Sequence, residues 1–300
     1  MRGPRGVLMV GMHRSGTSAA TRLVNLLGPA TCVPGDMVRG PWNPNGHFES
    51  RTLMHLNDAL LAQMGCRWWA PPPAGAAYAP VAAAVTTTGA QARRAFRRVH
   101  RSVPWVWKDP RTSVLLPFWR AALGPRVVAV VVYRHPLEVA RSLHSRHGLD
   151  LAFGVALWER YNRLILEHSA GMAVVVTPFE GVMGDPGGWS AGVRSFLVSQ
   201  GMRLGAVDDS SAAGFVDPAL RHNRSAAADM AGVPPGARAL YGVLESLQGP
   251  SPCFVTPALP AEGPEVGAEL ERVGPHTTPA WYPPPWAAGE ARAGGEGGAG

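Results

Sequence analysis

The sequence predicts an α/β fold in which a central parallel sheet lies between two layers of helices. Short apolar runs of strand type alternate along the chain with segments whose apolar residues recur at helical spacing. The run RVVAVVVY, residues 126–133, is rich in β-branched residues, as a strand covered on both faces requires. We therefore place it at the centre of the sheet, with ligand sites at the carboxyl ends of the strands.

The other elements are expected in a regular order. The apolar run at residues 6–11 is a strand, and the helical spacing of Ala20, Leu23, Val24 and Leu27 predicts a helix over residues 17–27. Further helices are expected at residues 51–64, 112–123, from 136 onward, and 151–168, and further strands at 105–108 and 172–177. Residues 70–84, rich in proline and alanine, are interpreted as a surface loop.

Composition indicates one globular domain followed by a tail. A chain of 300 residues with 46% hydrophobic residues can bury a sizeable core, which we assign to residues 1–248. Residues 249–300 contain ten prolines and ten glycines, too many for a packed core, and we expect most of this segment to be disordered. The oligomeric state stays open.

The charge of the chain favours an anionic ligand. The formal net charge is +7, and Lys108 is the only lysine among 28 basic residues. Nucleic acid is not expected as a partner, because the arginines are spread along the chain. The one dense cluster has helical spacing and is interpreted as a solvated helix face: Arg93, Arg94, Arg97, Arg98 and Arg101.

Cysteine usage and hydropathy favour a cytoplasmic protein. Cys32, Cys66 and Cys253 are few and widely spaced, so they indicate neither a disulfide framework nor a metal site. No apolar run approaches the ~20 residues that span a bilayer, and we expect no membrane span.

The segment GMHRSGTS, residues 11–18, follows the first strand with the glycine spacing of a phosphate-binding P-loop. Thr17 stands where such loops carry a lysine, while Arg14 places a cation inside the loop. Backbone N–H groups and the amino end of the next helix can still hold an anion there. A plain strand-to-helix turn capped by Ser15 or Thr17 is the structural alternative.

The HRSGTS motif resembles the 5′-phosphosulfate loop of sulfotransferases that use 3′-phosphoadenosine 5′-phosphosulfate (PAPS). The resemblance implies a P-loop nucleotide hydrolase-like fold and a site in which Arg14, Ser15, Gly16, Thr17 and Ser18 surround the 5′-phosphosulfate. It covers about residues 6–224 and includes several further segments in the same order. No metal is expected on this reading.

The segment YRHPLEVARSL, residues 133–143, supplies a second candidate phosphate site. Arg134 lies at the end of the central strand, and Ser142 falls about two turns into the following helix. In the family that the chain resembles, an arginine and a serine at this spacing hold the 3′-phosphate. Two phosphate sites on neighbouring strand ends fit a nucleotide phosphorylated at both ends. Taken alone, Arg134 could be an ordinary cation at a strand end and Ser142 an exposed serine on a helix.

The segment WVWKDPR, residues 105–111, places Lys108 directly after a strand. The family often has a lysine here, aimed at the transferring sulfuryl group, whereas a chance surface lysine is the alternative. Asp109 could orient Lys108 or Arg111 through an ion pair, although Asp-Pro-Arg also suits a plain turn.

The acceptor's proton needs a base, and NPNGHFES, residues 43–50, is the candidate segment. Glu49 is our first choice and His47 the second, followed by Asp36 and Asp109; the family itself varies in its base. Glu49 could equally be a capping or salt-bridging carboxylate at the start of the next helix.

Two later segments resemble the family less closely. In VVVTPFEGVMGDP, residues 174–186, Phe179 and Gly181 depart from the family's pattern, which leaves a role for Glu180 in doubt. In FVDPALRHNR, residues 215–224, Arg221 and Arg224 could add phosphate contacts. The expected acceptor loops are residues 68–78 and the segment after Ser142.

The function expected from the sequence is transfer of a sulfuryl group from PAPS to a hydroxyl or amine of a small-molecule or carbohydrate acceptor, releasing 3′-phosphoadenosine 5′-phosphate (PAP). Two alternatives remain open. One is a P-loop kinase of small molecules, and the other is a non-catalytic protein that binds a nucleotide or another polyanion.

Overall fold

A computed structural model describes residues 5–38, 48–75, 79–204 and 227–276. The described residues form a five-stranded sheet with the strand order β2-β1-β3-β4-β5. Its strands are β1 (Gly6–Val10), β2 (Trp105–Lys108), β3 (Val127–Tyr133), β4 (Ala173–Pro178) and β5 (Gly249–Ser251). The first four are parallel, and β5 runs antiparallel to β4. The predicted parallel sheet is confirmed for these four strands, with the β-branched strand β3 at the centre of the order.

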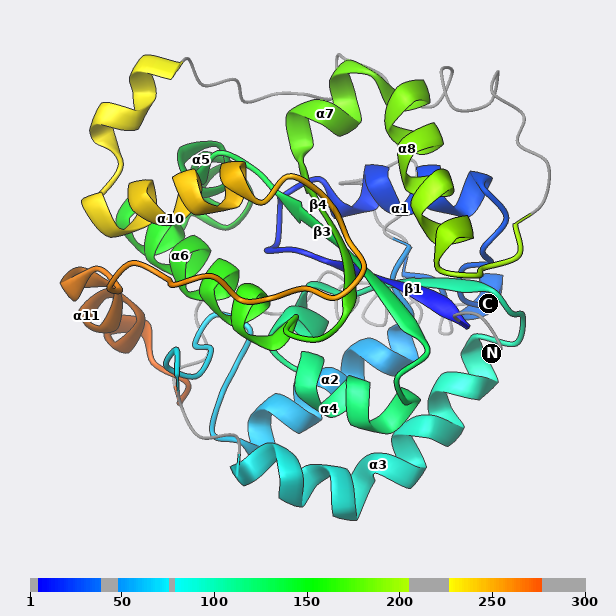
Figure 1. Ribbon diagram of the computed structural model, residues 1–300. Helices are drawn as coiled ribbons and strands as arrows, with labels where there is room; N and C mark the ends of the chain where they lie inside the picture. Colours follow the sequence, from blue (N-terminus) through cyan, green and yellow to red (C-terminus); the bar gives the residue numbers. More distant parts are fainter. Residues whose placement is uncertain (1–4, 39–47, 76–78, 205–226, 277–300) are drawn as a thin grey trace, which may run out of the picture.

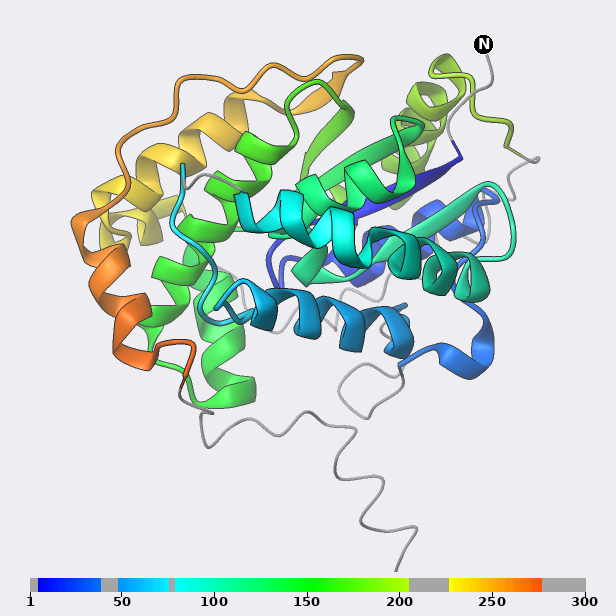
Figure 2. The ribbon, with the colours of Figure 1, turned by 90° about the horizontal axis from the view of Figure 1, so that it is seen from below.

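Helices cover both faces of the sheet (Figures 1 and 2). One face carries α1 (Thr17–Leu26), α7 (Phe179–Gly184) and α8 (Pro186–Ser199). The core of the other face is shared by α2 (Arg51–Gln63), α3 (Ala79–Val99), α4 (Leu116–Leu123), α5 (Pro136–His147), α6 (Leu151–His168), α10 (Pro235–Ser246) and α11 (Pro264–Val273). The three-layer α/β architecture expected from the sequence is therefore confirmed.

Strand β3 shows why both faces are covered. Successive side chains of a strand point to opposite faces of the sheet. Val128 and Val130 belong to the core beneath α1 and α8, whereas Ala129 and Val131 belong to the larger core on the other face. All seven residues of β3 are buried, because apolar side chains on both faces gain from removal from water.

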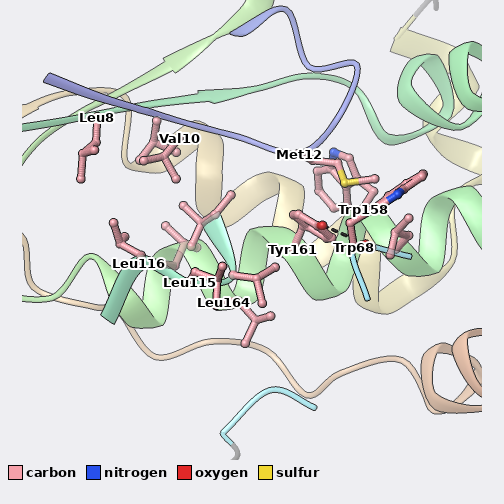
Figure 3. Close-up of a cluster of buried hydrophobic side chains, with 14 of the residues drawn as sticks. Leu8, Val10, Met12, Trp68, Leu115, Leu116, Trp158, Tyr161 and Leu164 are labelled. Carbon is pink, nitrogen blue, oxygen red and sulfur yellow. Dashed lines mark hydrogen bonds between the residues drawn. The ribbon is translucent and has the colours of Figure 1, made fainter. Parts of the chain in front are cut away.

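The larger core extends under the loop that follows β1. Figure 3 shows Leu8, Val10 and Met12 in one buried cluster with side chains from α4, α6 and the loop after α2. At its end, the Tyr161 hydroxyl donates a 2.8 Å hydrogen bond to the Trp68 carbonyl. The loop after α2 is thereby fixed to α6 beside the end of β1.

Three expectations about single segments were wrong. The helix expected over residues 112–123 begins at Leu116, because Pro110–Ser113 forms a 3₁₀ turn in which the Asp109 carboxylate accepts from the Arg111 backbone N–H. The loop expected over residues 70–84 ends earlier, since α3 begins at Ala79.

The third error concerns the tail expected from residue 249 onward. Strand β5 and helix α11 both lie in that segment. Phe254, Val266 and Leu270 are buried against the larger core, which gives this proline-rich segment enough apolar contact to pack. The chain after residue 276 lies outside the described residues.

Among the described residues, every helix is too short or too polar to cross a lipid bilayer.

Candidate active site

The candidate site lies at the carboxyl ends of β1, β2 and β3. In the register of the sheet, Met9 of β1 pairs with Lys108, and Val10 pairs with Val131 of β3. The loop after β1, residues 11–16, connects this edge to α1. We call this loop the cradle loop.

The cradle loop has the backbone of an anion site. Arg14 has φ 68° and Gly16 has φ 87°, so the chain turns sharply before α1. Gly16 caps α1 without a side-chain hydrogen bond, and the first turn contains no acidic residue. Ser15 is fully buried, and its Oγ has no hydrogen-bond partner among the described residues. A buried hydroxyl beside an uncapped helix amino end suits a negatively charged ligand.

Both glycines of the cradle loop are needed for close packing. A Cβ on Gly11 would lie 2.5 Å from the carbonyl oxygen of Val132, and a Cβ on Gly16 would lie 2.1 Å from the Phe179 ring. The Gly11 N–H also donates to Ser113 Oγ at 3.1 Å, which ties the loop to the turn after β2. The loop is thus held between β3, α7 and that turn. Thr17 is buried in the first turn of α1, and Ser18 beside it is half-buried.

The structure brings the two expected phosphate sites together. Arg14 Nε donates a 2.9 Å hydrogen bond to Ser142 Oγ, although 128 residues separate them. Arg134 Nη1 donates a hydrogen bond of 3.4 Å to the Arg14 carbonyl oxygen. Burial, followed by the charges of Arg146 and Arg134, lowers the pKa of Arg14 to about 10. Because these positive charges lie close together, a negatively charged ligand would bind favourably among them.

Arg134 is itself held in place on two sides. Its Nε donates to Glu138 Oε2 at 2.7 Å, and its guanidinium lies 4.4 Å from the centre of the Phe179 ring. The ring of Phe179 therefore packs between Gly16 of the cradle loop and Arg134. Phe179 is a site residue that the sequence reasoning set aside as a departure from the family's pattern.

Lys108 and Glu49 form an ion pair between Lys108 Nζ and Glu49 Oε1. Lys108 ends β2 and is 2% exposed, so it is not a chance surface lysine. Glu49 immediately precedes Ser50, the residue that caps α2 by accepting from the Leu53 N–H at 3.1 Å. The cap, rather than Glu49, satisfies the start of the helix, which leaves the Glu49 carboxylate directed to Lys108.

Asp109 is a structural residue. Its Oδ2 accepts from Asn57 Nδ2 at 2.9 Å, and its Oδ1 accepts from the backbone N–H and guanidinium of Arg111. Asp58 binds the same guanidinium at 2.6 Å. Burial opposes the positive charge of Arg111, but Asp109 and Asp58 together raise its pKa above the ordinary value. The expected ion pair of Asp109 is thus formed with Arg111.

Asp36 also has a structural position. Its carboxylate accepts from Ser50 Oγ and, at 3.1 and 2.6 Å, from the backbone N–H and hydroxyl of Thr52. These bonds hold the start of α2 and occupy both carboxylate oxygens of Asp36. His47, the second candidate base, lies outside the described residues. Arg221 and Arg224, the candidate phosphate contacts, lie outside them as well.

The expected acceptor loop begins with Trp68, which packs on the cradle loop. The ring centres of Trp68 and His13 lie 4.5 Å apart, and Trp68 is 4% exposed. His13 belongs to the sequence motif, but its packing on Trp68 could not be predicted, because the two residues are far apart in the sequence. Residues 76–78 of this loop lie outside the described residues.

Comparison with known proteins finds no matching family model and no matching curated protein. The solved structures that are similar to the chain include three sulfotransferases. The sulfotransferase domain of the olefin synthase of Synechococcus PCC 7002 is 15% identical, with a TM-score of 0.39, over 93% of this chain and 98% of that one.

The sulfotransferase STF1 of Mycobacterium tuberculosis H37Rv is also 15% identical, with a TM-score of 0.39, over 82% of this chain and 77% of that one. The sulfotransferase domain of the curacin biosynthetic pathway is 12% identical, with a TM-score of 0.38, over 91% and 98% of the two chains. All three are sulfotransferases, the class that the cradle motif resembles.

Proposed function

We propose that the protein is a PAPS-dependent sulfotransferase, which moves a sulfuryl group to a hydroxyl or amine of an acceptor and releases PAP. The observation that carries the proposal is the contact of Arg14 with Ser142 beside Arg134. It joins the cradle loop after β1 to the end of β3 in one cationic site. A single polyphosphate cradle would serve ATP, whereas two adjoining cationic positions suit a nucleotide with phosphates at both ends.

Donor binding is assigned to the residues of the cradle loop and of α5. The 5′-phosphosulfate would lie on the backbone N–H groups at the start of α1, with Ser15 Oγ as a further donor. Thr17 and Ser18 would complete this pocket. Ser142 and Arg134 would hold the 3′-phosphate, and Arg224 is proposed as an additional contact.

The charges of the site favour this donor. Burial, followed by the charges of Arg146 and Arg134, lowers the pKa of Arg14, so the charge of Arg14 is disfavoured next to Arg134. An anion between them would remove that repulsion, and buried guanidinium groups form strong charge-assisted hydrogen bonds with phosphate. The free energy lost by clustering cations in the free protein would be regained in the complex.

The chemical step uses the Lys108–Glu49 pair. Lys108 would turn from Glu49 to an oxygen of the sulfuryl group, which frees the Glu49 carboxylate to take the acceptor's proton. The acceptor oxygen or nitrogen forms a bond to sulfur. The bond from sulfur to the bridging oxygen breaks, and its electron pair stays on the phosphate of PAP. Arg14 and Lys108 would stabilise the negative charge that develops on these oxygens.

The free state of the cysteines suits a cytoplasmic location for such an enzyme. Cys32 and Cys66 are buried, Cys253 is exposed, and none of them forms a disulfide. Thr17 still stands at the position where a kinase needs its phosphate-binding lysine.

Thermal unfolding with added nucleotides tests the proposal. PAP at 100 times its Kd should stabilise the protein by about 2.7 kcal/mol without magnesium, while Mg·ATP should have little effect. Stabilisation by Mg·ATP alone would support the kinase instead. A screen of acceptors with radiolabelled PAPS then tests transfer, and binding of PAP without transfer to any of a broad acceptor panel would support a non-catalytic protein.

A further inference from the structure

His13 lies in the middle of the cradle loop, and the mechanism above gives it no role. Its imidazole packs on Trp68, with ring centres 4.5 Å apart and planes at 39°, and meets the edge of Tyr161 at 6.1 Å and 77°. Both neighbours are fixed, since the Tyr161 hydroxyl donates to the Trp68 carbonyl. Figure 3 shows these two aromatic residues together beside Met12, the residue before His13. The packing therefore fixes the orientation of the imidazole.

The Nε2 atom of His13 is buried and has no hydrogen-bond partner among the described residues. Buried polar atoms of side chains are usually satisfied, and leaving one unsatisfied costs free energy. Ser15 Oγ, two residues along the same loop, is buried and unsatisfied in the same way. Two such atoms in one cradle indicate a ligand that contacts the loop at both positions.

The groups that face His13 are mostly cations. Lys108 ends β2, Arg111 belongs to the turn after it, and Arg146 and His147 lie at the end of α5. Burial and then these charges hold the pKa of His13 well below its ordinary value, so the imidazole is neutral at neutral pH. Lys108 is paired with Glu49, and Arg111 is paired with Asp58 and Asp109. An anionic ligand oxygen at this position would meet these basic groups and would accept a hydrogen bond from a protonated Nε2.

We propose that His13 is a further catalytic residue, whose Nε2–H donates a hydrogen bond to an oxygen of the transferring sulfuryl group. This inference rests on the proposed function. His13 belongs to the cradle loop that would hold the phosphosulfate, and it lies near enough to Lys108 for that charge to act on its imidazole. The transferring sulfuryl group would lie beside both residues. A neutral imidazole can stabilise charge on the sulfuryl oxygens without giving up its proton.

The experiment compares binding of PAPS and PAP without an acceptor, because PAP lacks only the sulfuryl group. His13→Phe keeps a ring beside Trp68 but has no N–H. It should weaken PAPS binding roughly 10-fold or more, as expected for a lost hydrogen bond to a charged group, and change the Kd of PAP less than about twofold. His13→Gln, whose amide can place an N–H near the same position, should recover part of the PAPS affinity.

The outcomes separate this inference from the proposed function. If the wild-type protein binds neither nucleotide, the proposed function is wrong. If it binds both and His13→Phe weakens both equally, or neither, the role of His13 is overturned. If the His13 variants fail to fold, a measurement on the wild type still tests the proposal. In ¹⁵N NMR spectra, Nε2 of His13 should carry a proton, and its resonance should shift when PAPS is added but not when PAP is added. An unprotonated Nε2, or equal shifts with both, would reject the proposal.

Discussion

Lys108, which is buried, and Glu49, which is partly exposed, form an ion pair at the carboxyl end of β2, although 59 residues separate them in the chain. Each member neutralises the other in the free protein. Removal of one partner of a buried pair leaves an uncompensated charge, so conservative substitutions are the informative ones. If the pair opens when the donor binds, its two members have separable effects on binding and on chemistry.

Glu49→Gln is expected to lower kcat by about 10²- to 10⁴-fold, the range for loss of a general base. The amide oxygen can still accept from Lys108, so the Kd of PAP should change less than about threefold. Single-turnover transfer from PAPS to the acceptor found in the screen, together with calorimetric PAP binding, measures both. An equal loss in PAP affinity would mean that Glu49 only positions Lys108.

Asp36→Asn is the matched control, since Asp36 is another carboxylate at the start of α2. Its loss of hydrogen bonds to Ser50 and Thr52 should lower the free energy of unfolding by about 0.5–2 kcal/mol, as for a lost helix cap. The value of kcat should stay within about twofold. If instead Asp36→Asn abolishes transfer and Glu49→Gln does not, Asp36 is the base.

Gly16→Ala should damage both stability and donor binding. The φ of 87° is unfavourable for alanine, and the new Cβ would meet the Phe179 ring at 2.1 Å. We expect the free energy of unfolding, measured in urea, to fall by about 1–3 kcal/mol, with weaker PAP binding as the cradle N–H groups move. The control is Gly192→Ala on the exposed face of α8, where a new Cβ would have no neighbouring atom within 4 Å outside its own helix. That change should stabilise by about 0.4–1 kcal/mol.

Much of the site could be predicted from the sequence, because its residues follow strands. Arg134 directly follows β3, Lys108 ends β2, and Arg14 lies in the loop after β1. Parallel strands bring their carboxyl ends to one edge of the sheet. The partners of these residues could not be predicted. The bond between Arg14 and Ser142 depends on how far α5 tilts over the cradle, and the packing of Phe179 on Gly16 depends on α7.

The carboxyl-terminal part of the fold was missed for a compositional reason. Proline and glycine are frequent there, but Val266 and Leu270 lie four residues apart on α11 and are both buried. Pro250 lies in β5, at the edge of the sheet, where a missing backbone N–H costs little. A few well-spaced apolar anchors thus outweigh a composition that is typical of disorder.

His100→Leu should reduce the loss of stability in mild acid. Burial lowers the pKa of His100 to about 3, and neither ring nitrogen has a hydrogen-bond partner among the described residues. The unfolded chain binds a proton near pH 6.5 while the folded protein does not, so stability falls as pH drops below that value. From pH 7 to pH 5 this one residue should cost about 2 kcal/mol. Urea unfolding of both proteins at the two pH values measures the difference, and equal slopes would contradict the prediction.

Ser142→Ala tests the assignment of the 3′-phosphate. Ser142 Oγ accepts from Arg14 Nε in the free protein, and its hydroxyl would donate to the phosphate in the complex. The variant should bind PAP about 10-fold more weakly, the equivalent of one hydrogen bond of about 1–1.5 kcal/mol. Binding of adenosine 5′-phosphate, which lacks the 3′-phosphate, should stay within about twofold.

Ser145→Ala is the control for that comparison, because Ser145 lies on the same helix but is exposed, and its hydroxyl donates to the Arg141 carbonyl at 3.0 Å. It should leave the affinities for both nucleotides unchanged. Calorimetric titration of the wild type and of both variants with each nucleotide gives the six values needed. If Ser142→Ala weakens the two nucleotides equally, Ser142 acts only by holding Arg14. The 3′-phosphate must then bind elsewhere, and the joined cationic site would lose the feature that distinguishes PAPS from a nucleotide phosphorylated at one end.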